Sequence, residues 1–156
     1  MMDEQAMVET VAQMLIQREM RLGTVECGVD GVVSRRMFGS ADGPAVLGDS
    51  LILDDVSEAV VLLNLPRPQF KKQGDFSAKA SRAAAREGRS VLGVDVCLVV
   101  WAPPSDQDWE TPQGLYVAVS VRDDVSGETF QFEGSREAAR DWIADRALEF
   151  IRQALE

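Results

Sequence analysis

The sequence predicts an α/β protein, a three-layer α/β/α domain with a mixed, mainly parallel sheet that includes a C-terminal hairpin. Three patterns indicate this class. Segments with apolar residues at helical spacing alternate along the chain with short apolar segments typical of strands. The run 94–101 is almost entirely apolar, as in a strand buried on both faces. Near the C-terminus, turn residues at 123–127 join two strand-like segments and predict an antiparallel pair.

The first half of the chain is expected to contain three helices and two strands. Apolar residues recur at roughly helical spacing in the helical segments, and acidic residues near the start of the first one favour a helix N-terminus. Gly39 is expected to close the second helix, and turn residues at 40–44 predict a loop. The expected helices span 4–21, 32–38 and 56–63, and the expected strands span 24–26 and 45–53.

The second half is expected to contain two longer helices and the rest of the sheet. Ser77 is a favourable N-cap for the Ala-rich helix 78–89, and Ser135 is a favourable N-cap for the last helix. A polar loop at 103–114 follows the apolar strand 94–101. The remaining expected strands span 115–121 and 129–132.

The composition limits the classes of protein to which this sequence can belong. A length of 156 residues with 46% apolar and 27% charged residues predicts one soluble domain, spanning 1–156. The net charge of −10 argues against nucleic-acid binding and against anionic membrane surfaces. The acidic start lacks the regions of a signal peptide, and no apolar run is long enough to span a membrane. We therefore expect no membrane partner and a cytoplasmic location.

The chain contains no histidine, which excludes several kinds of catalytic site. Ser-His-Asp and Cys-His catalysis cannot be built within it, nor can a zinc site that uses histidine. The two cysteines, Cys27 and Cys97, are too far apart in sequence for a CxxC motif and too few for a disulfide scaffold. The carboxylates show no EF-hand spacing. We expect neither a metal nor a cofactor.

A candidate site follows from the α/β class. Ligands in such sheets gather at the carboxyl ends of the strands, which places the segments 26–31, 53–58 and 99–112 near one another. The first of these lies in the stretch V-E-C-G-V-D-G, where a strand passes into a helix. A nucleophile or a phosphate is often presented at a turn of this kind.

Five motifs in order resemble the C-terminal domain of the CinA family, which includes nicotinamide mononucleotide deamidases. The resemblance covers about residues 8–155. The family's Glu-Ser-Cys-Thr-Gly-Gly falls without gaps on 26–31, and its Gly-x-Arg-Glu falls on 134–137. Its Leu-Gly-Gly, its Gly-x-x-Ser turn and its Pro-x-Gly strand start fall on 47–49, 74–77 and 112–119.

The resemblance implies a CinA C-terminal-like fold, amide hydrolysis of nicotinamide mononucleotide and self-association. It also implies a serine nucleophile assisted by a tyrosine and a lysine, with a Thr-Gly-x-Ala-Gly-Pro loop that holds the ligand. This sequence has a different residue at each of these catalytic positions and a different ligand-binding loop. The serine falls on Cys27, the tyrosine on Leu53 and the lysine at about Glu58. The loop becomes Val-Val-Trp-Ala-Pro-Pro at 99–104, and Asp30 places a carboxylate at the helix start.

Cys27 is open to two interpretations. A thiol at a helix N-terminus can have a lowered pKa and act as a nucleophile. However, no lysine aligns with the family's base, and the nearby carboxylates of Glu26, Asp30 and Glu58 are expected to raise the thiol pKa. The alternative, which we favour, is a small buried thiol that fills the volume of the serine.

Other residues near the site also have a structural alternative. The acids at 54, 55, 58, 106, 108 and 110 would suit acid/base chemistry or a bound cation; the alternative, which we favour, is that such runs are solvated helix caps. Arg36 matches a family arginine and, with Arg35, would suit an anion; arginines on a helix more often pair with neighbouring acids. Trp101 and Trp109 would suit a planar ligand, with core packing as the alternative for Trp101 in particular.

Three hypotheses remain. We favour a degenerate CinA-type domain that has lost amidase chemistry and acts as a ligand-binding or assembly module. The alternatives are an active nicotinamide-nucleotide amidase or related amidohydrolase that uses Cys27, and a structural protein whose pocket is closed by Trp101, Pro103 and Pro104. The expected partners are a small molecule that need not be a nucleotide and a second copy in a homodimer. Cys27 is the candidate catalytic residue, and the candidate ligand-binding residues are Glu26, Gly28, Asp30, Gly31, Arg36, Leu53, Glu58, Val99, Trp101 and Ala102.

Overall fold

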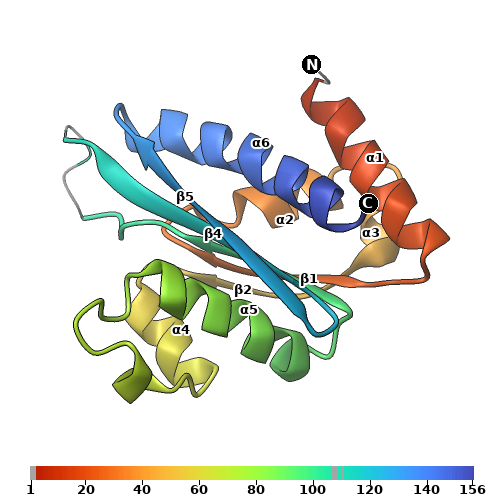
Figure 1. The fold of residues 1–156 in the computed structure, drawn as a ribbon. Coiled ribbons are helices and arrows are strands. Elements are labelled where there is room, and N and C mark those ends of the chain that lie inside the picture. The colour runs from red at the N-terminus through yellow and green to blue at the C-terminus, as the bar shows by residue number, and fades with distance from the viewer. Residues whose placement is uncertain (1–2, 107–108, 110) are drawn as a thin grey trace.

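The computed structural model of the protein describes residues 3–106, 109 and 111–156. Its helices and strands alternate along the first two thirds of the chain, and a hairpin and a long helix complete it (Figure 1). The α-helices are α1 Glu4–Gln17, α2 Val32–Phe38, α3 Gly43–Val46, α4 Val56–Leu62, α5 Ala78–Leu92 and α6 Arg136–Ala154, with a 3-10 turn η1 at Arg67–Gln69. The strands are β1 Leu22–Cys27, β2 Leu47–Leu53, β3 Val96–Trp101, β4 Gln113–Val121 and β5 Asp124–Phe132.

The five strands form a single mixed sheet in the order β2-β1-β3-β4-β5. β1 pairs in parallel with both β2 and β3, while the pairs β3–β4 and β4–β5 are antiparallel. The mixed sheet and its C-terminal hairpin confirm the prediction, but the sheet is not mainly parallel, because the strand pairs are divided evenly between the two directions. As a result, β1, β2 and β3 end at the same edge of the sheet.

Helices cover both faces of the sheet, so the domain has three layers (Figure 1). Side chains from α1, α2, α3 and α6 form one core cluster with the sheet, and side chains from α4 and α5 form a second cluster on the opposite face. Alternate residues of a strand therefore enter different layers, as strand geometry requires. On β1, Leu22 belongs to the first cluster, whereas Val25 and Cys27 belong to the second.

Helix caps predicted from the sequence are present in the structure. The Ser77 hydroxyl accepts a hydrogen bond from the Ala80 N–H at 3.1 Å and begins α5. The Ser135 hydroxyl accepts one from the Ala138 N–H at 3.1 Å and begins α6. Each satisfies an amide that the first turn of a helix leaves unpaired. These two serines fix where the long helices start.

Several element boundaries differ from the prediction; α5, for example, runs to Leu92 rather than to residue 89. The strand expected at 45–53 begins at Leu47, because Pro44 occupies the first turn of the short helix α3. The hairpin turn is tighter than expected: Val121 and Asp124 are register partners, and Arg122 adopts a left-handed φ of 53°. The first helix ends at Gln17 rather than at residue 21, and the following strand is correspondingly longer. None of the helices in the described parts of the chain is both long and apolar enough to cross a membrane.

Candidate functional site

Three backbone and side-chain contacts tie the carboxyl ends of the parallel strands together. The Gly28 N–H donates to the Leu53 carbonyl at 2.9 Å, and the Ala102 N–H donates to the Cys27 carbonyl at 3.0 Å. Beyond β3, the backbone N–H and the hydroxyl of Ser105 donate to the carboxylate of Asp54 at 2.9 and 3.0 Å. The segments that follow β1, β2 and β3 thus lie side by side, and they are held together by the chain itself.

Cys27 ends β1 inside the apolar layer formed with α4 and α5. Its side chain is fully buried, and its register partners are Leu53 on β2 and Trp101 on β3. Burial, followed in size by the negative charges of Asp55 and Glu58, raises the pKa of the Cys27 thiol to about 12. The thiol is therefore neutral at physiological pH, which is the opposite of what a thiolate nucleophile requires.

Glu26 faces the opposite layer, where its buried carboxylate caps α2. One oxygen accepts a hydrogen bond from the Val33 N–H at 2.8 Å. The other accepts from the N–H and the hydroxyl of Ser34 at 3.1 and 2.5 Å, and from the Thr24 hydroxyl at 2.9 Å. Because the N-cap residue of α2, Gly31, has no side chain that could cap the helix, Glu26 supplies the acceptor that the first turn needs. Glu26 is fully engaged within the chain.

Gly28 and Gly31 are required by the geometry of the turn between β1 and α2. Both adopt a left-handed φ, 79° and 69°. A Cβ on Gly28 would lie 2.4 Å from the carbonyl oxygen of Pro103, and one on Gly31 would lie 2.6 Å from a side-chain carbon of Ile52. The glycines therefore permit close packing of the turn against the chain, so their presence does not by itself indicate a ligand.

Asp30 turns away from Cys27 and pairs with the start of α6. Its carboxylate accepts a hydrogen bond from Arg136 at 3.0 Å and forms a close ion pair with Arg140. Arg136 also donates to the carbonyl of Gly28 at 3.2 Å. The hydrogen bond from Arg136 is the main cause of a lowered pKa for the Asp30 carboxyl, and Arg140 lowers it further. Asp30 thus fastens the turn after β1 to the last helix.

The segment that replaces the glycine-rich loop packs into the core. Val99 lies in the interior of β3, whereas Trp101 and Ala102 lie at its end, and all three are fully buried. The indole N–H of Trp101 donates to the backbone carbonyl of Asp75 at 2.7 Å. Trp101 is thus packed in the core, which was the alternative to stacking on a planar ligand. Trp109 packs in the core on the other face, with 7% of its surface exposed, so the prediction that it suits a stacked ligand is not supported there.

Of the remaining candidate residues, two lie near the strand ends and one lies far from them. Leu53 ends β2 and packs beside the cluster that contains Cys27, and Glu58 is exposed in the first turn of α4. Arg36 lies elsewhere: its guanidinium contacts the carboxylates of Glu4 on α1 and Asp145 on α6 at 3.1 and 2.7 Å. Arg36 therefore joins three helices, as arginines with neighbouring acids often do, and does not reach the strand ends.

The acidic residues do not form a cation site in the described part of the chain. Asp54 is held by Ser105, and Asp55 caps α4 by accepting a hydrogen bond from the Ser57 N–H at 3.0 Å. Asp106 is exposed. Residues 108 and 110, which belonged to the same predicted cluster, lie outside the described residues. Within the described residues, no group of three or more potential ligands is placed to hold a metal ion.

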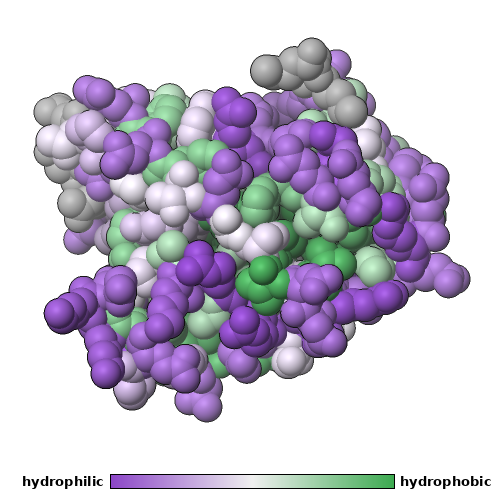
Figure 2. Space-filling view, viewed as in Figure 1, coloured by the Kyte–Doolittle hydropathy of each residue, from purple (hydrophilic) through white to green (hydrophobic). Residues whose placement is uncertain are grey.

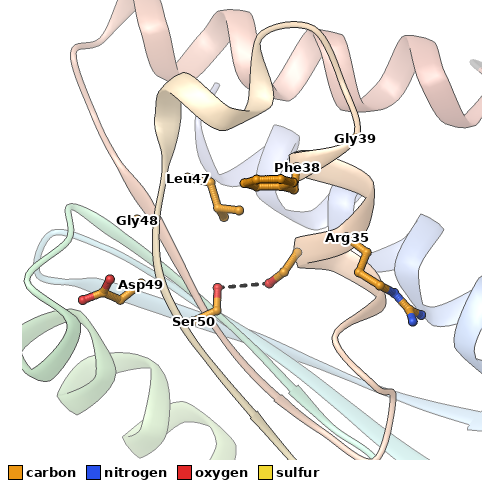
Figure 3. Close-up of a pocket in the computed structure, with 8 residues that line it drawn as sticks. Arg35, Phe38, Gly39, Leu47, Gly48, Asp49 and Ser50 are labelled. Carbon is orange, nitrogen blue, oxygen red and sulfur yellow. Dashed lines mark hydrogen bonds between the residues drawn. The ribbon is translucent and has the colours of Figure 1, made fainter.

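The hollows of the surface that we describe lie away from the strand ends. One, of about 480 Å³, lies between α2 and the edge strand β2 (Figure 3). Figure 3 shows the Phe38 ring above Leu47, with the hydroxyls of Ser34 and Ser50 joined by a hydrogen bond of 3.0 Å. The others adjoin the helices α1, α2 and α6. None is lined by described residues of 53–58 or 99–106.

Several residues that complete this region were not singled out by the sequence. Thr24, Ser34 and Ser50 surround Glu26, and Arg136 and Arg140 hold Asp30. The only sequence signal for Arg136 is its place in the Gly-x-Arg-Glu motif, and nothing in that motif names its partner 106 residues away. Polar pairs of such separation can be found only after the chain has folded.

Comparison with known proteins agrees with this fold over the whole chain. The family model described as the CinA C-terminal domain matches residues 4–155. A CinA-like protein of Geobacter sulfurreducens is 29% identical over 148 residues, which cover 93% of this chain and 36% of that protein. A CinA-like protein of Desulfotalea psychrophila is 28% identical over 156 residues, covering 98% of this chain and 38% of that protein. The chain therefore spans less than two fifths of the length of these relatives.

Solved structures share the fold at lower sequence identity. A competence or damage-inducible protein from Enterobacter asburiae matches with a TM-score of 0.89 at 16% identity, covering 100% of both chains. A competence-damaged protein (CinA) superfamily protein from Enterobacter cloacae matches with a TM-score of 0.88 at 14% identity, covering 100% of this chain and 94% of that one. Because the family model matches almost every residue, the chain belongs to the CinA C-terminal domain family.

Proposed function

We propose that this protein is a catalytically degenerate CinA C-terminal-type domain that acts as an assembly module. The observation that carries the proposal is the environment of Cys27, which occupies the position of the family's nucleophile. Its thiol is fully buried, its pKa is about 12, and the charges that reach it are those of carboxylates. A nucleophile needs the reverse: access to substrate and a base or cation that favours the thiolate.

The lack of a base supports the same proposal. The chain has no histidine, and its three lysines are Lys71, Lys72 and Lys79, none of which aligns with the family's lysine at Glu58. Loss of any one member of a catalytic group usually lowers the rate by several orders of magnitude. Here the nucleophile, the tyrosine, the lysine and the ligand-binding loop all differ from the family pattern.

Closure of the strand ends favours assembly over ligand binding at this position. The space beside Gly28 is taken by the carbonyls of Ala102 and Pro103, and the indole of Trp101 is held by Asp75. A small molecule placed at Cys27 would have to displace these contacts. The expected small-molecule ligand stays a prediction for this site, and a partner that binds an exposed surface meets no such obstacle.

The proposal is tested by incubating the purified protein with nicotinamide mononucleotide and measuring ammonia release. We expect no release above that of the matched Cys27→Ala variant. Cys27→Ser, which restores the family's residue, is also expected to be inactive because Leu53 and Glu58 still stand in place of the tyrosine and lysine. Ammonia release by the native protein that disappears in Cys27→Ala would overturn degeneracy and support an active amidase.

A further inference from the structure

The segment 67–89 carries a charge opposite to that of the rest of the chain. It holds seven of the 16 lysines and arginines, including all three lysines, but only two of the 26 aspartates and glutamates. Its net charge is therefore +5, whereas the rest of the chain carries −15. Figure 2, viewed as Figure 1, shows mainly hydrophilic residues over α5, which forms the second half of this segment. The segment thus forms a cationic surface on an otherwise acidic molecule.

The cations of α5 lie along one face of the helix. They are separated by three, four and three positions, so their side chains leave the same side of α5. At about 1.5 Å for each residue, the row is about 15 Å long. We call these four residues the basic stripe: Lys79, Arg82, Arg86 and Arg89. Lys71 and Lys72, which precede α5, add two exposed cations.

The sheet holds α5 in place from the face opposite to the stripe. The buried residues of α5 are small and pack with the strands (Figure 1). A Cβ on Gly88 would lie 2.8 Å from the Cys97 sulfur, so the helix lies close against the sheet. Gly127 of β5 leaves room for the stem of Arg82, because a Cβ there would lie 3.1 Å from its Cγ. The stripe therefore projects from a rigid support, which limits the entropy lost when a partner binds.

Most cations of the segment have no acidic partner within the described part of the chain. Arg89 reaches the exposed Asp123 at 3.6 Å, and Arg67 pairs with Asp75 at 2.7 Å. Five exposed cations form no ion pair with any described residue: Lys71, Lys72, Lys79, Arg82 and Arg86. Glu87 is the only acid in the sequence of α5, and it is not at the spacing of the stripe.

The stripe differs from an ordinary solvated helix face. Such faces usually mix both signs, since like charges three or four positions apart oppose helix formation. In the stripe, every such pair consists of two cations. The stability of α5 therefore does not account for the stripe, and a negatively charged partner does.

The shape of the surface favours an extended partner over a small anion. None of the hollows described above is lined by residues of 67–89. Helical residues three or four positions apart hold their Cβ atoms about 5–6 Å apart along a line, so the cations do not converge on one point. A partner that contacts all of them carries several negative charges spread over about 15 Å.

Nucleic acids and membranes fit the stripe less well than a short acidic segment does. Duplex DNA carries a negative charge about every 1.7 Å and continues past both ends of the stripe, toward the acidic remainder of the protein. An anionic membrane extends further still. Single strands are usually held by exposed aromatic rings as well, but Phe70 is buried and Phe76 packs edge-on against Tyr116. The partner is therefore short.

We propose that the basic stripe binds a short acidic helix of another protein, with aspartates or glutamates at the same three- and four-residue spacing. About ten residues of helix span 15 Å and present one row of carboxylates, so the helix matches the stripe in length, spacing and charge. Because it ends where the stripe ends, it avoids the acidic surface beyond. Lys71 and Lys72 add to the positive potential that attracts it.

This inference gives the assembly function proposed above a surface and a class of partner, and in that respect it rests on that proposal. Peptide binding is measured without any substrate, whereas loss of catalysis is measured by ammonia release. Each result can therefore fail without the other.

Fluorescence anisotropy of a labelled peptide titrated with the whole chain is the first measurement. The probe is an alanine-rich helical peptide of about 20 residues with blocked ends and four glutamates at the spacing of the stripe. The control peptide has the same composition, with its glutamates distributed around the helix. We expect the probe to bind at least tenfold more tightly than the control. Equal affinities, or no binding of the probe at about 1 millimolar protein, would overturn the proposal.

Substitutions identify the surface that binds the probe. One variant neutralises the exposed, unpaired cations of α5: Lys79→Gln, Arg82→Gln and Arg86→Gln. Its affinity should fall about tenfold or more, because each exposed ion pair changes affinity about two- to fivefold. The matched control removes the same charge from exposed arginines elsewhere: Arg18→Gln, Arg35→Gln and Arg146→Gln. It should bind about as well as the native protein, and an equal loss in both variants would rule out the stripe as the site.

Competition tests the class of partner. Single-stranded DNA, duplex DNA and vesicles of equal parts phosphatidylserine and phosphatidylcholine should displace the probe only at higher concentrations of negative charge than the unlabelled peptide needs. Displacement by DNA or vesicles at a lower concentration would assign the stripe to that polyanion instead. Salt should weaken binding of the probe by screening the charges, and binding that does not change with salt would contradict the charge argument.

Discussion

Glu26 and Cys27 are adjacent on β1 and are both fully buried, yet they meet opposite surroundings. Glu26 enters the layer of α2, where two backbone N–H groups and two hydroxyls donate to its carboxylate. Cys27 enters the layer of α4 and α5, where apolar side chains surround it and the nearest charges are carboxylates. A buried charge is tolerated where donors surround it, and burial suppresses ionisation where they are absent.

Under the proposed loss of amidase chemistry, this difference explains how the family's site keeps its shape. Glu26 has a structural task, since it caps α2 and positions the turn, and that task does not depend on catalysis. Cys27 stands where the family resemblance places a nucleophile, and its small buried thiol fills that space. The turn between β1 and α2 is therefore preserved by the contacts on one face of β1 while the other face has been closed.

The largest expected loss of stability follows from a substitution of Glu26. Glu26→Leu removes the acceptor for the N–H groups of Val33 and Ser34 and leaves buried donors unpaired, which should lower the free energy of unfolding by about 3–5 kcal/mol. Cys27→Ala, equally buried on the same strand, should lower it by only about 1–2 kcal/mol. Urea unfolding followed by circular dichroism measures both. The reverse order of the two losses would contradict the comparison.

The next largest effect is expected where the turn packs against the end of β3. Gly28→Ala forces a left-handed residue with a Cβ 2.4 Å from the Pro103 carbonyl oxygen, and should lower the free energy of unfolding by about 2–4 kcal/mol. Gly74 is the matched control, because it has a similar φ of 73° but no atom within 4 Å of its would-be Cβ. Gly74→Ala should lose about 1 kcal/mol. Equal losses would show that strain in φ, and not the closed packing, limits position 28.

Alkaline pH should lower the free energy of unfolding through the buried thiol of Cys27. The folded pKa of Cys27 is about 12, above the ordinary value of 9.0, so the stabilisation is complete below pH 9 and is lost as pH rises toward 12. The loss is about 1.4 kcal/mol for each pH unit and each such thiol. Cys97, also buried with a pKa of about 12, contributes equally. Cys27→Ala should therefore halve the slope of unfolding free energy against pH between 9 and 10.5; an unchanged slope would show that Cys27 ionises freely in the folded state.

The smallest effect is expected at Asp30, whose side chain is 43% exposed and therefore screened by solvent. Asp30→Asn should lower the free energy of unfolding by about 0.5–1 kcal/mol at neutral pH. Because Arg136 lowers the pKa of this carboxyl in the fold, its stabilisation is present above pH 3.8 and is lost as pH falls below that value. The variant and the native protein should thus converge in stability at low pH. A difference that persists there would be unrelated to the charge of Asp30.

The elements of the fold were predictable because their signals are local. The serine caps of α5 and α6 and the apolar run of β3 depend on residues within a few positions of one another, so most elements appear where they were expected. The boundaries of α3 and β2 were less predictable, because four residues around Pro44 can extend a strand or start a helix. Packing of Val46 into the core decides between these outcomes.

The candidate site was predictable in its position and only partly in its contacts. Parallel strands end at one edge, so the meeting of β1, β2 and β3 followed from topology. The roles of Asp30 and Arg36 did not, since each pairs with residues of α6 more than 100 positions away. Whether a charged side chain faces a ligand or an ion-pair partner depends on such distant residues.

By itself, the sequence determined the α/β class, the helix caps and the lack of histidine that excludes Ser-His-Asp, Cys-His and histidine-containing zinc sites within this chain. Tertiary structure alone decided which face of β1 each side chain enters, and with it the fate of Glu26 and Cys27. The physical reason is that hydrogen-bond donors, carboxylates and apolar walls come from segments far apart in sequence. Only folding brings these groups together around a buried side chain, and together they decide whether that side chain is charged, neutral or reactive.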